Sequence, residues 1–261
     1  MLGTLIKSNA ILMIPKIIHY CWFGRGEKPA LAKRCIASWR KFFPDYEIKE
    51  WNEDNFNVNI IPYTAEAYAC KKYAFVSDYA RFWVLYKYGG LYFDTDVEVI
   101  RPMDDIVARG PFMGIETPAL ADEMPGVNPG LGLAAYSGLG LYGEILDYYK
   151  NLHFLTDDGK PNEVTVVTHV TNVLQKAGLR ATNGVQCVKG MWIYPEDYFN
   201  PFDDLTGKLK KTENTRTIHW YSKTWMSNGQ TLRNKLTRIL HRVFGVEHIH
   251  RIGVKIKSIY K

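Results

Sequence analysis

Two carboxylates, Asp94 and Asp96, stand one residue apart at the end of the stretch YGGLYFDTDV, which covers residues 88–97. The glycine pair stops a preceding helix, and the apolar run 91–93 predicts a short buried strand. Because successive side chains on a strand point to opposite faces, the two acids are expected to share one face, where they repel each other unless a cation lies between them. Mg²⁺ and Mn²⁺ favour carboxylate oxygens and often bridge a protein to substrate phosphates, so the stretch predicts a metal–diphosphate site. Two solvated acids at a strand end are the alternative.

The elements before this stretch are expected to form a parallel sheet. Residues 16–23 are rich in β-branched and aromatic side chains and predict a first strand, and Pro29 opens a helix that runs to about residue 43. Residues 46–51 alternate as a second strand. A strand–helix–strand start with short links favours a Rossmann-like sheet. Because no G-x-G-x-x-G follows the first strand, a dinucleotide-binding enzyme is not expected.

The rest of the chain continues the α/β pattern. Ser77 is expected to cap a helix over 78–88, and the strand that carries the two acids is expected to continue to Ile100. Residues 117–132 predict a long functional loop without regular structure. The further predicted elements are a strand over 112–116, helices over 142–152 and 164–177, a strand over 185–194 and a loop over 217–225.

The charge of the chain is concentrated at one end. Residues 231–261 carry eight Lys or Arg and one Glu, a balance of +7, whereas the remainder carries 25 basic and 26 acidic residues. Four cysteines show no C-x-x-C spacing, which predicts reduced thiols in a cytosolic protein, and no segment has the roughly 20 apolar residues of a membrane span. The domains are expected to be an N-terminal extension (1–12), one catalytic domain (13–230) and a basic amphipathic tail (231–261).

Three blocks of the sequence resemble one known family. The segment YAFVSDYARFWVLYKYGGLYFDTDVEVI resembles the core motif of glycosyltransferase family 32, IPKIIHYCWFG resembles its first strand, and IHWYSKTW resembles its C-terminal His-x-x-x-x-[ST]-Trp segment. The blocks occur in the expected order between Ile14 and Trp225. The resemblance implies an α/β, GT-A fold with a Rossmann-like mixed sheet flanked by helices, a nucleotide-sugar donor, Mn²⁺ or Mg²⁺, and retention of anomeric configuration.

The first two blocks imply the residues that hold the donor. Trp22, followed by Gly24, matches the aromatic residue that stacks on the nucleotide base; a core Trp is the alternative. Asp78 and Arg81 match the acid and base that contact donor sugar hydroxyls and phosphate, with a helix-surface ion pair as the alternative. Tyr92 matches a tyrosine whose hydroxyl reaches a phosphate, although it equally suits the strand core.

The resemblance also implies a separate role for each residue near the metal. Asp96 is the expected direct ligand, Asp94 is expected to bridge the metal and the ribose or donor sugar, and His219 is the third candidate ligand. Thr224 stands where the family commonly has Ser, and Ser222 is an alternative to it. Two further positions are expected to border the substrates: Trp225 closes over the donor, and Asn128 lines the acceptor side.

The basic tail leaves two possibilities open. Its apolar residues fall on one helical face, which suits either an anionic membrane surface or packing against the catalytic domain. No recognised nucleic-acid-binding module accompanies the charge, so a nucleic-acid partner is not expected. A cytoplasmic protein at the inner face of the cytoplasmic membrane is therefore predicted.

The function predicted from these blocks is transfer of a sugar to a glycan or lipid-linked glycan acceptor in bacterial surface polysaccharide synthesis (capsule, lipopolysaccharide or lipooligosaccharide). The expected donor is a UDP-hexose, with GDP-mannose as a second choice. Two alternatives stay open. A haloacid-dehalogenase-like, Mg²⁺-dependent phosphatase has an apolar run followed by D-x-D, but that motif lies near its N-terminus, and a non-catalytic sugar-binding or membrane-docking module needs no intact acids.

Overall fold

The strand β1 (Ile17–Cys21) lies inside the main sheet, as its β-branched and aromatic sequence predicts. It pairs in parallel with β2 (Glu47–Trp51) on one side and with β3 (Gly90–Tyr92) on the other, and α1 (Ala30–Phe42) connects β1 to β2. The computed structural model that shows this arrangement describes residues 13–119, 123–222, 237, 238 and 242. The predicted parallel strand–helix–strand start is confirmed.

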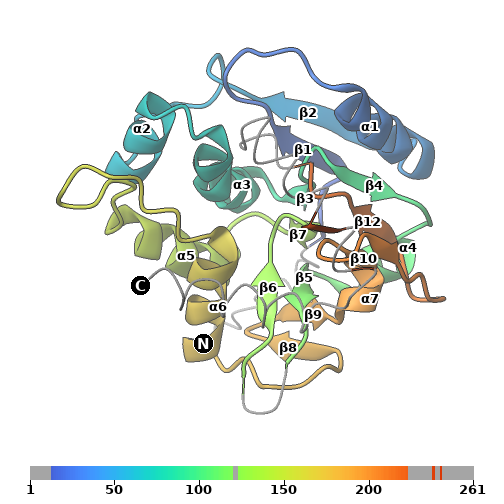
Figure 1. The fold of residues 1–261 in the computed structure, drawn as a ribbon. Coiled ribbons are helices and arrows are strands. Elements are labelled where there is room, and N and C mark those ends of the chain that lie inside the picture. The colour runs from blue at the N-terminus through green and yellow to red at the C-terminus, as the bar shows by residue number, and fades with distance from the viewer. Residues whose placement is uncertain (1–12, 120–122, 223–236, 239–241, 243–261) are drawn as a thin grey trace, which may run out of the picture.

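The other half of the main sheet is antiparallel in part (Figure 1). Strand β7 (Leu133–Ala135) pairs antiparallel with both β3 and β5 (Phe112–Thr117), and β6 (Gly126–Asn128) pairs antiparallel with β5. Strand β9 (Met191–Tyr194) is parallel to β5 and antiparallel to the edge strand β8 (Gln186–Val188). The eight-stranded mixed sheet confirms the predicted α/β fold class. The loop without regular structure that was predicted over 117–132 is wrong in part, because residues 126–128 form β6 and pair with β5.

Helices cover both faces of this sheet (Figure 1). One face carries α2 (Pro62–Ala69), α3 (Tyr73–Tyr88), α5 (Gly140–Lys150) and α6 (Val166–Lys176), and the other carries α1, α4 (Asp104–Arg109) and α7 (Glu196–Phe199). The side chains of β3 and its continuation alternate between the two cores. Leu91 and Phe93 pack on the side of α1, and Tyr92 packs on the side of α3.

Helix α3 begins four residues before the predicted cap. Ser77 lies inside it, where its hydroxyl donates to the carbonyl of Tyr73 at 3.2 Å, so the prediction that Ser77 caps the helix is wrong. A serine inside a helix often satisfies its hydroxyl in this way, and the sequence does not distinguish that arrangement from a cap. The predicted C-terminal stop is confirmed, because Gly89 adopts a φ of 67° and its N–H donates to Leu85.

The two acids lie in a turn and not on a continuous strand. The N–H of Val97 donates to the carbonyl of Asp94 at 3.0 Å, and the chain then enters a separate strand, β4 (Val97–Val99). This strand pairs antiparallel with β12 (Thr217–His219), which occupies part of the predicted loop over 217–225. Both predictions, a strand from the acids to Ile100 and a loop over 217–225, are corrected here, because pairing between segments 120 residues apart decides the structure of both.

The small hairpin of β10 (Phe202–Asp203) and β11 (Lys208–Leu209) contacts two described residues of the basic tail. The Arg238 guanidinium bonds Asp204, and Nη2 of Arg242 donates to the carbonyl of Gly207 at 2.9 Å. Apart from 237, 238 and 242, the residues of 231–261 lie outside the described residues, as do all of 1–12, so the predicted domain boundaries stay predictions. Among the described helices, none is long and apolar enough to cross a membrane.

Candidate functional site

The Asp94–Asp96 turn lies at the C-terminal ends of the neighbouring strands β1 and β3. These strands are parallel, with His19 opposite Tyr92, so the residues that follow them leave the sheet side by side. Trp22 and Gly24 follow β1, and the two acids follow β3. The topology therefore brings together the two sequence blocks that are predicted to hold the donor, and their role in binding it stays a prediction.

Arg81 is the centre of the first set of contacts. It is 3% exposed, and its Nη2 lies 2.8 Å from Oδ1 of Asp78 and 3.2 Å from Oδ1 of Asp94. Its Nε donates to the carbonyl of Ser77 at 3.1 Å, one turn earlier on α3, and its guanidinium lies 5.1 Å from the ring centre of Tyr92. The Tyr92 hydroxyl in turn donates to Asp94 at 3.1 Å. Asp78, Arg81, Tyr92 and Asp94 thus form one polar cluster, which is buried except for the partly exposed Asp94.

Two carboxylates share the one guanidinium of this cluster, which leaves it short of positive charge. Burial raises the pKa of Asp78 to about 7, and Arg81 opposes that shift without cancelling it. Burial also raises the pKa of Asp94, against the same opposing effect of Arg81. A cation that binds beside Asp94 would relieve this excess of negative charge. Protonation of Asp78 or Asp94 would have the same effect.

Asp96 has a different set of hydrogen-bond partners from Asp94. Its Oδ1 lies 3.2 Å from Nε2 of His219, and its Oδ2 accepts from the N–H and the hydroxyl of Ser222 at 2.7 and 2.8 Å. Burial alone would raise the pKa of Asp96, but His219 and Ser222 hold it well below its usual value. Burial alone would lower the pKa of His219, but the Asp96 carboxylate raises it. Asp96 and His219 therefore form a buried pair in which each group favours the charged form of the other.

The donor groups at this turn suit a hard divalent cation only in part. Carboxylate oxygens and an imidazole are appropriate ligands, and Nδ1 of His219 is buried with no hydrogen-bond partner among the described residues. In the part of the chain that the structure describes, however, no three His, Cys, Asp or Glu side chains are placed to hold a cation together. The residues therefore fit a cation held by one or two carboxylates and completed by substrate phosphates, the usual arrangement for Mg²⁺.

The segment after β1 is held in place by the loop that follows β2. The indole N–H of half-buried Trp22 donates to the carbonyl of Gly26 at 2.6 Å, and the N–H of Gly24 donates to Glu53 at 2.6 Å. Gly24 has a φ of 91°, and a Cβ there would lie 2.3 Å from the ring of Tyr73. Glycine is therefore required at this position. The stacking of Trp22 on a base stays a prediction.

A second wall of the site comes from segments that the sequence did not connect. Asn128, predicted on the acceptor side, accepts from the N–H of Gly130 at 2.6 Å and donates to Oε1 of Glu116 at 3.2 Å. The Tyr221 hydroxyl donates to the same oxygen at 2.9 Å and accepts from Nδ2 of Asn200 at 2.8 Å. Glu116, Asn200 and Tyr221 were missed. The one available signal was an acid at the end of an apolar strand, FMGIE, the pattern that singled out Asp94. Thr224 and Trp225 lie outside the described residues.

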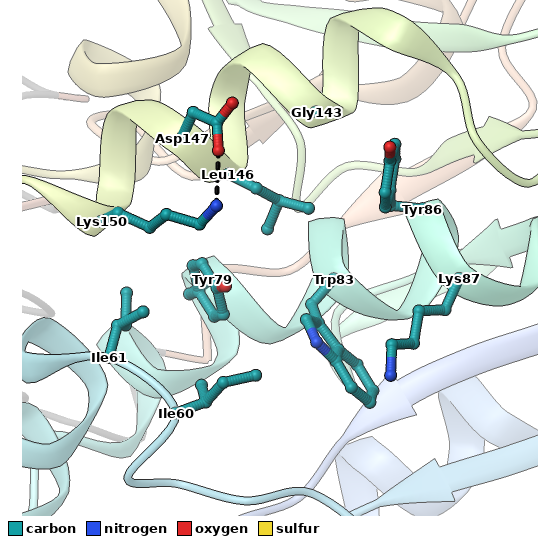
Figure 2. A pocket seen from close by; sticks show the side chains of 10 residues that line it. All are labelled: Ile60, Ile61, Tyr79, Trp83, Tyr86, Lys87, Gly143, Leu146, Asp147 and Lys150. Atoms are coloured by element: carbon teal, nitrogen blue, oxygen red, sulfur yellow. Dashed lines mark hydrogen bonds and ion pairs between the residues drawn. The ribbon is translucent and has the colours of Figure 1, made fainter.

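A pocket of about 380 Å³ lies against α3 (Figure 2), and neither Asp78 nor Arg81 lines it. Its walls are mostly aromatic and aliphatic side chains from α3, α5 and the segment before α2, among them Tyr79, Trp83 and Leu146. None of the residues predicted for the donor, the acceptor or the metal lines it. Helix α3 thus contributes side chains both to a charged cluster and to an apolar pocket.

In a comparison with known proteins, one family model matches the segment that contains Asp94 and Asp96. The family model described as "Glycosyltransferase sugar-binding region containing DXD motif" matches residues 29–113. Inositol phosphoceramide mannosyltransferase 3 of Schizosaccharomyces pombe is 34% identical over 110 residues, which are 39% of this chain and 30% of the relative. Inositol phosphoceramide mannosyltransferase 1 of the same organism is 26% identical over 111 residues, 38% of this chain and 33% of the relative. The chain therefore spans about a third of the length of these relatives.

Two solved glycosyltransferase structures are similar to this chain at low TM-score and low sequence identity. The PaToxG glycosyltransferase has a TM-score of 0.45 and 19% identity over 62% of this chain and 69% of its own. A glycosyltransferase involved in the glycosylation of the major capsid of PBCV-1 has a TM-score of 0.49 and 9% identity over 86% of this chain and 100% of its own.

Proposed function

Because the chain carries a glycosyltransferase sugar-binding region of the family 32 type, with Asp94 and Asp96 as its D-x-D motif, we propose that it is a metal-dependent, retaining glycosyltransferase. It moves a hexose from a nucleotide-sugar donor to a glycan acceptor. The observation that carries the proposal is the burial of Arg81 against Asp78 and Asp94 beside the end of β1. Together with a divalent cation beside Asp94, this buried guanidinium would offer positive charge to a diphosphate.

The chemistry follows from where charge develops. When the bond between the sugar and the diphosphate breaks, the leaving phosphate gains negative charge, and Arg81 offers it a fixed cation in a buried site. A divalent ion bound by Asp94 and Asp96 would act as a Lewis acid on the same phosphate. Tyr92 holds Asp94 in position through its hydroxyl, and Asp78 offers a carboxylate to the donor sugar hydroxyls. No nucleophile of the chain is assigned, so retention proceeds by front-face attack, with the leaving phosphate taking the acceptor's proton.

The donor is proposed to be a UDP-hexose, with its base on Trp22. GDP-mannose is the second candidate, and a specific observation favours it, since both S. pombe relatives are named as mannosyltransferases. The D-x-D family match supports either donor over the phosphatase alternative, in which Asp94 would be a nucleophile.

The proposed acceptor is a glycan or lipid-linked glycan of a bacterial surface polysaccharide, reached at the inner face of the cytoplasmic membrane. The excess of basic residues in 231–261 supports membrane contact, whereas the bonds from Arg238 and Arg242 to residues 204–207 support packing on the catalytic domain. Sedimentation with anionic liposomes separates the two. Loss of binding on deletion of residues 231–261 supports the membrane role, and unchanged binding contradicts it.

The test of the transferase itself is donor-dependent thermal stabilisation and donor hydrolysis with UDP- and GDP-sugars, each with and without Mn²⁺. A ligand that binds only the folded state at 100 times its Kd stabilises it by about 2.7 kcal/mol. Asp96→Asn should abolish the Mn²⁺-dependent part, and the exposed acid Asp45, replaced in Asp45→Asn, serves as the control. No response of the wild-type protein to any donor would contradict the proposal.

A further inference from the structure

Glu116, which no motif of the sequence includes, is held by one of its two carboxylate oxygens. Oε1 accepts from the hydroxyl of Tyr221 at 2.9 Å and from Nδ2 of Asn128 at 3.2 Å. Nδ2 of Asn200 donates to the Tyr221 hydroxyl at 2.8 Å and to the backbone carbonyl of Glu116 at 3.2 Å. Within the described residues Oε2 accepts no hydrogen bond, and Glu116 is only partly buried. The carboxylate is therefore fixed in orientation while one oxygen stays available.

This carboxylate belongs to the same site as the D-x-D turn. The Asn128 side chain that holds Glu116 also accepts from the N–H of Gly130, and a Cβ on Gly130 would lie 3.0 Å from Asn128 Oδ1 and 2.0 Å from Asp94 Oδ2. On the other side, the rings of Tyr221 and His219 are 4.1 Å apart, and His219 contacts Asp96. Gly130 therefore lies between the Glu116 cluster and Asp94, and His219 lies between the cluster and Asp96.

The cluster also keeps hydrogen-bonding capacity unused. Oδ1 of Asn200 is buried and has no partner among the described residues. Nearly all buried polar groups in folded proteins are hydrogen-bonded, so this unpartnered oxygen beside Glu116 is consistent with a polar ligand. Tyr221 has a φ of 49°, which a non-glycine residue adopts at a cost, and such strain is common where a side chain must be aimed at a ligand.

We propose that Glu116 binds the glycan acceptor, with Oε2 accepting a hydrogen bond from a sugar hydroxyl and with Tyr221 and Asn128 holding the carboxylate for that contact. This inference rests on the proposed transferase function and extends it to the acceptor side. A charge-assisted bond to a sugar hydroxyl is strong, and a carboxylate that is already fixed loses little entropy when it forms.

The role is one of positioning and specificity and not of proton transfer. In the transfer step the bond from the anomeric carbon to the phosphate oxygen breaks, and the acceptor oxygen bonds that carbon. The hydroxyl proton passes to the leaving phosphate. Glu116 accepts a hydrogen bond from the acceptor and keeps its own charge throughout, so its removal should weaken acceptor use without changing how the donor is held.

The experiment is Glu116→Gln in the full chain. Because Tyr221 and Asn128 both donate to Oε1, the new carbonyl oxygen takes that place and the new NH₂ group replaces Oε2, which turns an acceptor into a donor at the one atom that faces the glycan. Two rates are measured with the donor found above: hydrolysis of the donor by water, and transfer to a panel of p-nitrophenyl α- and β-hexosides. Transfer kcat/KM is expected to fall about 10- to 100-fold, while hydrolysis and donor-dependent thermal stabilisation stay within about twofold of the wild type.

Two more variants complete the test. Glu144→Gln removes an exposed carboxylate that pairs with Lys189 and should change neither rate, and Glu116→Asp keeps the charge but shortens its reach, so its loss should be intermediate. Unchanged transfer by Glu116→Gln, or an equal loss of hydrolysis and transfer, would overturn the inference and leave the transferase standing. A wild-type protein that responds to no donor would instead overturn the proposed function, and this inference with it.

Discussion

The two walls of the site differ in how they hold their charges. On the wall built by α3 and β3, Arg81 is buried between the carboxylates of Asp78 and Asp94, so every charge has a charged neighbour. On the wall built by β5, β6 and the segment after β12, the Glu116 carboxylate is held by the neutral groups of Asn128 and Tyr221. A substitution on the first wall should lower the unfolding free energy substantially, because removing one charge leaves its buried partners uncompensated.

This difference fits two kinds of ligand. A diphosphate carries charge and needs a fixed cation, which the first wall supplies in a desolvated place where electrostatic interactions are strong. A glycan hydroxyl is neutral and needs a correctly aimed acceptor, which the second wall supplies at a partly exposed carboxylate. Substitutions on the first wall should therefore affect folding as well as turnover, and those on the second wall should affect mainly the choice and use of the acceptor.

The largest effect is expected from Arg81→Met. Removing one partner of a buried charge network leaves the others uncompensated and costs about 3–5 kcal/mol of unfolding free energy. Urea denaturation of the variant measures that loss, with Arg34→Met as the control, since the exposed Arg34–Glu98 pair should contribute no more than about 1 kcal/mol. Adding Asp78→Asn to Arg81→Met should recover part of the loss. A loss equal to that of the control would mean that the first wall is not a coupled network.

The two walls meet at Gly130, and Gly130→Ala should loosen that junction. A Cβ there would lie 2.0 Å from Oδ2 of Asp94, so the carboxylate or its loop must shift. Donor hydrolysis is expected to fall about 10- to 100-fold, as small misplacements of catalytic groups commonly do. Gly26→Ala is the matched control, because nothing lies within 4 Å of its Cβ position. Equal rates for both variants would contradict a close junction at Asp94.

The same two walls show how far the sequence alone predicts this site. Asp78 and Arg81 lie on α3, Tyr92 lies on β3 and Asp94 lies in the turn that follows, so these four residues are close in sequence and one family motif includes them all. Glu116, Asn200 and Tyr221 come from separate segments that meet only because β5 lies in the main sheet and β12 pairs with β4. The turn at Asp94–Asp96 was missed for the same reason, since the long-range pairing of β4 with β12 overrides local pattern. Strand β6 was missed because it has only three residues.

A smaller effect concerns pH and Asp78. Its pKa is raised to about 7 in the folded protein, above the ordinary value of about 3.8, so the folded state holds this proton more tightly than the unfolded state does. The contribution of Asp78 to the unfolding free energy therefore falls as pH rises from about 4 to about 7. Asp78→Asn cannot titrate, so its unfolding free energy relative to the wild type should rise by about 1–2 kcal/mol between pH 4.5 and pH 8. A constant difference across that range in urea denaturation would show that Asp78 is ionised throughout.

The smallest effect, and the one that best separates the walls, is expected from Tyr221→Phe. The change removes the hydroxyl that donates to Glu116 and accepts from Asn200, which should cost about 1 kcal/mol of unfolding free energy. Glu116 then keeps its charge but is held by Asn128 alone, so transfer to the hexoside panel should fall about two- to fivefold, because a less firmly oriented carboxylate must be ordered on binding. Donor hydrolysis should not change, and Tyr88→Phe, at an exposed tyrosine, should alter neither rate. If Tyr221→Phe slows hydrolysis and transfer equally, the ring contact of Tyr221 with His219 carries its effect to Asp96, and the two walls act as one unit in the reaction.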